Sequence, residues 1–107
     1  MADLWGALAQ VAPAATTLTD AYTVPTARHA TIEVVICNTG ALANVRLAHA
    51  IAGAADSIKQ YLLRDYALAV AETRTTLRFT AAAGDVIRVY STTATVAFNV
   101  NGIEEAA

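Results

Sequence analysis

The sequence predicts an all-β fold: a single small antiparallel β-sandwich, jelly-roll or immunoglobulin-like, of about six to eight strands with an N-terminal arm. Three observations lead to this prediction. From Ala15 onward, short runs rich in Thr, Val, Ile and Tyr alternate apolar and polar residues. Gly, Asn, Asp and Pro separate these runs at short intervals. No long helical stripe interrupts them, so one domain is expected, with residues 1–14 as the arm and 15–107 as the sandwich.

The clearest expected strand is 28–37, because alternate positions place four apolar residues on one face: Ala30, Ile32, Val34 and Ile36. Asn38 and Gly40 then supply turn residues that tolerate positive φ. The other expected strands are 43–51, 58–63, 73–79, 86–91 and 95–101. Among their inward residues are Val45, Leu47, His49, Ile51, Thr75, Leu77, Phe79, Val96, Phe98 and Val100. Residues 67–72 are expected to form an irregular connection or helical turn, and Glu104 and Glu105 a solubilising tail.

The arm carries apolar residues at helix-like spacing, but Pro13 would end any helix early, and so short a helix is marginal alone in water. It also holds the only Trp of the chain. Leaving these side chains in solvent would be costly, so the arm either docks as an edge strand on its own sheet or reaches a neighbouring subunit. The arm residues expected at an interface are Leu4, Trp5, Leu8 and Val11.

Charge and composition exclude several classes of protein. The chain has seven Lys+Arg and nine Asp+Glu, which gives a net charge of -2. Its cations do not form a basic run, so no nucleic-acid partner is expected. No apolar stretch reaches the roughly 20 residues that span a bilayer, and Asp3 stands where a signal peptide carries a cation. We therefore expect no membrane partner and synthesis in the cytoplasm. The single cysteine, Cys37, cannot form an internal disulfide and is expected to be a small buried thiol.

We find no pattern of residues that predicts catalysis, a metal site or a cofactor. His29 and His49 lie on different expected strands, without a carboxylate at ligand spacing. The expectation for His49 is a half-buried position at a sheet or subunit interface, and for His29 a solvated one. No nucleophile motif and no phosphate-binding glycine loop occur. The sequence thus predicts a protein that is not an enzyme.

Arginines on the outward faces of the expected strands are either solvated or positioned to fix contacts between subunits. They are Arg46, Arg74, Arg78 and Arg88, with Glu33, Asp65, Glu72 and Asp85 as available partners. Hydrophobic residues make up 56% of the chain and charged residues only 15%. This charged fraction is low for an isolated monomer. This composition predicts that subunit contacts cover part of the surface, in a trimer or larger homo-oligomer.

Three motifs in order along the chain resemble those of small structural proteins of tailed-bacteriophage virions. They are the segments 19–25, 36–40 and 83–90, which read TDAYTVP, ICNTG and AGDVIRVY. The chain departs from the pattern at Arg28-His29, where relatives tend to have Gly-Lys, and at His49, where an aliphatic is usual. The resemblance implies a non-enzymatic virion component present in many copies.

From this resemblance we expect a capsid decoration or cement protein that binds the major capsid protein or other virion proteins. A neck, tail or baseplate accessory protein is the alternative within the same class. The alternative from another class is a carbohydrate-binding sandwich for host attachment, in which aromatic rings stack on sugars. Its candidate residues are Trp5, Tyr61, Tyr66 and Tyr90.

Overall fold

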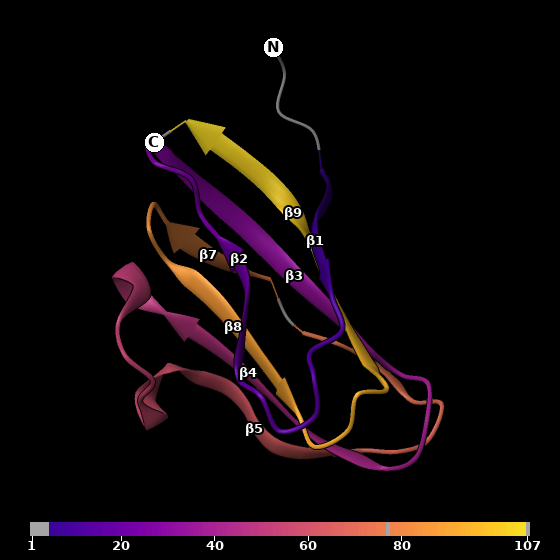
Figure 1. Ribbon diagram of the computed structural model, residues 1–107. Helices are drawn as coiled ribbons and strands as arrows, with labels where there is room; N and C mark the ends of the chain where they lie inside the picture. Colours follow the sequence, from indigo (N-terminus) through magenta and orange to yellow (C-terminus); the bar gives the residue numbers. More distant parts are fainter. Residues whose placement is uncertain (1–4, 77, 107) are drawn as a thin grey trace.

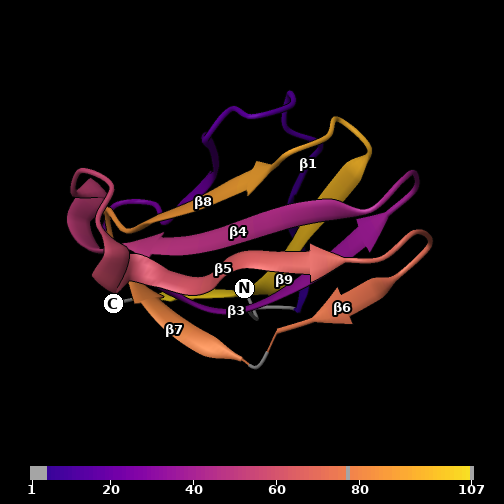
Figure 2. The same cartoon turned by 90° about the horizontal axis from the view of Figure 1, so that it is seen from below.

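A computed structural model describes residues 5–76 and 78–106, and it confirms an all-β fold of two antiparallel sheets (Figures 1 and 2). Over these ranges the chain forms nine strands, slightly more than predicted. They are β1 (Gly6–Val11), β2 (Thr19–Thr23), β3 (Arg28–Asn38), β4 (Ala43–Ala50), β5 (Tyr61–Leu68), β6 (Thr73–Thr75), β7 (Phe79–Ala82), β8 (Val86–Ser91) and β9 (Val96–Ala106). Two 3-10 turns, η1 (Ile51–Gly53) and η2 (Ile58–Gln60), lie between β4 and β5.

The large sheet has the strand order β1-β9-β3-β6, with β7 also paired to β3, and the small sheet has the order β2-β8-β4-β5. The ladder between β3 and β9 lies in the middle of the large sheet. It runs from Arg28 opposite Ala106 to Asn38 opposite Val96. On one side of the sandwich, β5 and the β6–β7 run are both sheet edges (Figure 2). We call this side the open side.

The core lies between the inner faces of the two sheets. The alternation predicted for 28–37 is confirmed, since Ala30, Ile32, Val34 and Ile36 have no exposed surface. They pack in one cluster with side chains from β9, β4 and β8 that are equally buried: Val96, Phe98, Val100, Val45, Leu47, Ile87 and Val89. Fully burying a side chain of this size contributes about 1.5–3 kcal/mol, so this cluster holds the two sheets together.

The expected strand 73–79 is two strands in the structure. Thr75 lies opposite Val35 and Phe79 opposite Ile32, so four steps on this strand match three on β3 and the chain bulges between them. The Oγ1 of Thr76 accepts a hydrogen bond of 3.0 Å from the backbone N–H of Val34, where a regular ladder would use a carbonyl. Leu77, expected to face inward, lies outside the described residues.

Three other boundaries differ from the prediction. The segment 58–63 begins as η2, and β5 then runs through Leu68, so the first part of the expected irregular connection is strand. Ile51 belongs to η1 rather than to β4 and is 69% exposed, because the chain turns away from the core there. Glu104 and Glu105 are not a tail, since β9 continues past them to Ala106 and pairs with the start of β3.

Residues 6–11 dock as an edge strand on the chain's own large sheet, the first of the two arrangements left open by the sequence. β1 pairs with β9, with Gly6 opposite Gly102 and Val11 opposite Phe98. Leu8 and Val11 pack against the core cluster, which accounts for their apolar character. Trp5, just before β1, remains 44% exposed. Leu4 lies outside the residues that the structure describes.

Candidate functional site

His49 is held by a buried carboxylate at one end of the sandwich. Its Nε2 lies 2.7 Å from Oδ2 of Asp85, and only 18% of the His49 side chain and 7% of the Asp85 side chain are exposed. The His49 ring also packs 5.6 Å from the ring of Phe79 on the other sheet. The two residues are 36 positions apart, so no spacing rule could have paired them. The half-buried His49 of β4 therefore contacts both the turn before β8, through Asp85, and β7, through Phe79.

Asp85 organises the turns around it. Its Oδ1 accepts a hydrogen bond of 2.8 Å from the backbone N–H of Ala52, and its Oδ2 one of 3.0 Å from that of Ala82. Burial alone would raise the pKa of Asp85, but these hydrogen bonds and the one with His49 outweigh it and lower the pKa below its ordinary value. A carboxylate with these partners ties η1 to the β7–β8 turn.

The arginines find partners that differ in part from those expected. Arg46 binds Asp65 at 2.7 Å and Arg78 approaches Glu33 at 3.6 Å, as the list of available carboxylates allowed. Arg88 instead binds Asp20, its cross-strand neighbour, at 3.0 Å. It also donates to the carbonyl oxygens of Ala54 and Gly53, at 2.7 and 3.3 Å. Arg88 thus fastens the loop after η1 to β8.

Glu72, expected as an available partner for an arginine, instead accepts hydrogen bonds with both of its oxygens near the end of β5. The hydroxyl of Tyr66 and the backbone N–H of Ala69 each donate to it at 2.8 Å. These donors, of which the backbone N–H has the larger effect, lower the pKa of Glu72. Arg74 is left with its guanidinium over the Tyr66 ring.

Each of the four aromatic residues considered for sugar stacking has an arginine over its ring. The distances from guanidinium carbon to ring centroid are 4.5 Å for Arg46 on Tyr90, 5.0 Å for Arg64 on Tyr61, 4.6 Å for Arg74 on Tyr66 and 4.7 Å for Arg78 on Trp5. Tyr66 packs against the core, whereas Tyr90 lies opposite Arg46 on the outer face of the small sheet, and Tyr61 also interacts with Arg46. One face of each ring is covered, which leaves less room for a sugar.

The two outer sheet faces differ in charge. On the small sheet the ion pairs Arg46–Asp65 and Arg88–Asp20 bridge neighbouring strands. On the large sheet, the central outward positions of β3 and β9 alternate with core residues and are half-buried: Thr31, Glu33, Val35, Cys37, Ala97, Asn99, Asn101 and Ile103. Glu33 is the single charge among them. Cys37 is half-buried on this face rather than enclosed in the core.

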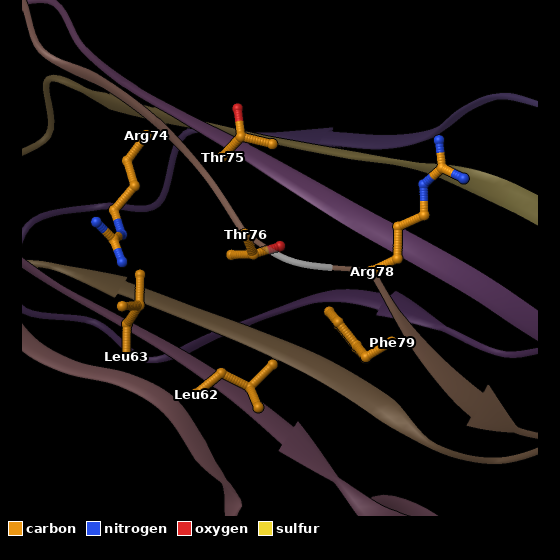
Figure 3. Close-up of a pocket in the computed structure, with 7 residues that line it drawn as sticks. All are labelled: Leu62, Leu63, Arg74, Thr75, Thr76, Arg78 and Phe79. Atoms are coloured by element: carbon orange, nitrogen blue, oxygen red, sulfur yellow. The ribbon is translucent and has the colours of Figure 1, made fainter.

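Large apolar side chains are exposed at several places on the surface: Trp5, Leu18, Leu42, Ile51, Ile58, Leu62 and Val70, at 36% to 76%. Two hollows lie near some of them. The first, about 430 Å³, is on the open side and is lined by Leu62, Leu63, Arg74, Thr75, Thr76, Arg78 and Phe79 (Figure 3). The second, about 460 Å³, is lined by His49, Ile51, Ala54, Lys59 and Gln60. His49 and Phe79, which are in ring contact, connect the two.

In the part of the chain that the structure describes, no group of three or more His, Cys, Asp or Glu could hold a metal ion. Nor does any helix there have the length and apolar character needed to cross a membrane. The candidate sites that the described residues present are the two hollows and the outer face of the large sheet.

Fold and surfaces together define a small antiparallel β-sandwich with exposed apolar residues. No protein-family model matches the chain, and no curated protein sequence matches it. Among solved structures, it is similar to a pentameric capsid protein isolated from metagenomic phage sequences, with 16% identity and a TM-score of 0.41. That match covers 94% of this chain but 61% of the other, so this chain spans less than two thirds of its length.

Proposed function

We propose that this chain is a non-enzymatic structural protein of a tailed-phage virion, most concretely a capsid decoration or cement protein that binds the assembled shell. The observation that carries the proposal is the set of seven large apolar side chains that are exposed among the residues the structure describes. Exposed side chains of this kind lower the free energy of association when a partner covers them, at about 25 cal/mol per Å². The three ordered motifs that resemble virion proteins supply the class of partner.

Multivalency makes this surface sufficient for stable attachment. A single contact of a few hundred Å² supplies several kcal/mol before the costs of association, which is weak binding. Copies joined in a trimer or larger homo-oligomer engage the shell at several points at once and bind far more tightly than each copy alone. In this proposal Trp5, the outer face of the large sheet and the open side meet neighbours.

In this proposal four of the expected interface residues support the surface instead of contacting the shell. Leu8 and Val11 pack on the core, His49 is bonded to Asp85, and Arg88 is bonded to the loop after η1. Trp5, Arg74 and Arg78 remain in the interface proposal, because Trp5 is exposed and the two arginines line the first hollow.

The test is binding of the purified chain to shells assembled from the major capsid protein of the same phage, measured by co-sedimentation with and without Trp5→Ser and Leu62→Ser. We expect saturable binding by the parent chain and at least tenfold weaker binding by the double variant. Deleting residues 1–12 would be a poorer test, since it removes β1. Absence of binding together with a monomeric solution mass would refute the proposal.

A carbohydrate-binding module is the second candidate, supported by the exposure of Trp5 and by Tyr61 and Tyr90 at the surface. A glycan-array signal that Tyr90→Ala removes would support it over the shell-binding function. A blank array with positive sedimentation would reject it.

A further inference from the structure

The first hollow has the features of a binding groove for an acidic segment of a partner. We call it the basic groove and define it by its lining residues: Leu62, Leu63, Arg74, Thr75, Thr76, Arg78 and Phe79. It lies on the open side, between the edge strand β5 and the β6–β7 run. Figure 3 shows Leu62, Leu63 and Phe79 along one side of it, the Arg74 guanidinium directed toward Leu63 at one end, and Arg78 at the other end with its guanidinium directed away from Phe79. Its volume of about 430 Å³ is within the range of small-ligand and side-chain sites.

The lining of the groove is cationic, whereas the chain as a whole is net negative, and the carboxylates Glu33 and Glu72 lie just outside this lining. The lining residues include two cations and no carboxylate, and the net charge of the chain is -2. The apolar part is also unusual for an edge, because Leu62 is 45% exposed beside Phe79. A segment that complements both features carries carboxylates next to aliphatic side chains.

Each of the two arginines stacks on an aromatic ring and has a carboxylate near it, Glu72 for Arg74 and Glu33 for Arg78. Arg74 stacks on Tyr66 at 4.6 Å and Arg78 on Trp5 at 4.7 Å. A stacked guanidinium keeps its N–H groups at the rim of its plane, where they fit the two oxygens of a carboxylate. Within the described residues the carboxylates nearby do not use these donors fully. Glu72 is bonded to Tyr66 and Ala69, and Glu33 is 3.6 Å from Nε of Arg78, beyond a good hydrogen bond.

The two edges beside the groove are poorly suited to extend a sheet. In β5, Tyr66 and Leu63 lie opposite Val45 and Leu47, so the strand bulges, and Asp65 has a φ of 54°. The other edge is interrupted at residue 76, where Thr76 uses its side chain in the ladder. Irregular edges of this kind disfavour addition of a new strand. A bound segment would thus be held by its side chains.

We propose that the basic groove binds an extended segment of a partner virion protein in which acidic and aliphatic residues alternate. Carboxylates of that segment pair with Arg74 and Arg78, and its aliphatic side chains cover Leu62, Leu63 and Phe79. The identity of the partner as a virion protein rests on the proposed function, but the chemistry of recognition does not. The same geometry explains why the exposed Leu62 lies next to cations.

The test uses the full chain and a capped heptapeptide, Val-Asp-Leu-Glu-Val-Asp-Leu, beside a matched peptide with Asn and Gln in place of Asp and Glu. Binding is measured by calorimetry and by the fluorescence of Trp5, the only Trp in the chain, which stacks on Arg78. We expect the acidic peptide to bind at least tenfold more tightly than the amide peptide. Its affinity should fall several-fold between 50 and 300 mM salt. Failure of the acidic peptide to bind, or equal binding of both, overturns the proposal.

Matched variants locate the site. Arg74→Gln with Arg78→Gln should reduce affinity for the acidic peptide at least tenfold, whereas Arg46→Gln with Arg64→Gln removes the same charge elsewhere and should change it less than twofold. Equal loss in both double variants would mean that net charge, not the groove, attracts the peptide. The peptide comparison on the parent chain needs no variant to fold. Shell binding that survives Arg74→Gln with Arg78→Gln rejects the groove as the docking site but leaves the proposed function intact.

Discussion

The guanidinium of Arg78 lies 4.7 Å from the centroid of the Trp5 ring, although the two residues come from opposite edges of the large sheet. Trp5 precedes β1 at one edge, Arg78 precedes β7 at the other, and β9 and β3 run between them. The pair thus spans the outer face of the sheet. It also positions one of the two arginines of the basic groove, and so connects the N-terminal residues to the proposed binding site.

We expect Trp5 and Arg78 to stabilise the fold jointly. A partly exposed cation–π pair contributes about 0.5–1 kcal/mol, so a double-mutant cycle with Trp5→Ala and Arg78→Ala should show coupling of that size in urea unfolding. Trp5→Ala combined with Lys59→Ala is the control and should be additive, because Lys59 lines the other hollow. Zero coupling between Trp5 and Arg78 would show that the stack does not persist in solution.

Replacing Asp85 by Asn should lower the free energy of unfolding by about 2–3 kcal/mol. The amide group has only one oxygen for the donors that Asp85 now binds, so at least one partly buried N–H loses its acceptor. Equilibrium urea unfolding at pH 7 measures the change. Glu105→Gln is the control, since that carboxylate is 46% exposed and lies 3.7 Å from His29, and should cost under about 0.5 kcal/mol.

The same carboxylate should make stability depend on pH. The pKa of Asp85 is lowered in the folded chain from an ordinary value of 3.8, so its contribution is present above that value and is lost as the pH falls through the folded pKa. We expect the unfolding free energy of the parent chain to drop below about pH 4, and that of Asp85→Asn to drop less. If the unfolding free energies of the two proteins fell in parallel between pH 5 and 2, Asp85 would not be the source of the pH dependence.

Gly102→Ala should disrupt the large sheet. A Cβ on Gly102 would overlap the carbonyl oxygen of Thr31 and lie 3.1 Å from its carbonyl carbon and 3.2 Å from Cα of Ile32. Because these are backbone atoms of the central ladder, relief requires β3 and β9 to separate, and we expect a loss above about 3 kcal/mol or failure to fold. Gly6→Ala, which meets nothing within 4 Å, should change thermal unfolding little.

Thr76→Val should cost about 1–2 kcal/mol, because the N–H of Val34 would lose its acceptor while the shape of residue 76 is nearly kept. Thr75→Val, on the exposed neighbouring position, should stay within about 0.5 kcal/mol. Chemical denaturation of the two variants gives the comparison. A neutral Thr76→Val would mean that water replaces the hydroxyl.

Periodicity was sufficient to predict the fold class and the inward faces of the main strands. Alternation from Ala30 to Ile36 reports directly which side chains avoid water, and the structure buries all four. Lengths and breaks were predicted less well. Thr76 interrupts a strand through a hydroxyl that bonds to β3, and Glu104 belongs to a strand because β3 lies beside it. Such effects depend on the neighbouring strand, which local sequence does not specify.

The sequence by itself determined that this protein is an all-β sandwich with an apolar, weakly charged composition, since those properties follow from the order and kind of its residues. Only the tertiary structure decided which residues meet: Asp85 with His49, Arg78 with Trp5, and two arginines with Leu62 around one groove. These contacts join residues far apart in the chain, and strand order, which no local pattern encodes, sets the distances between them.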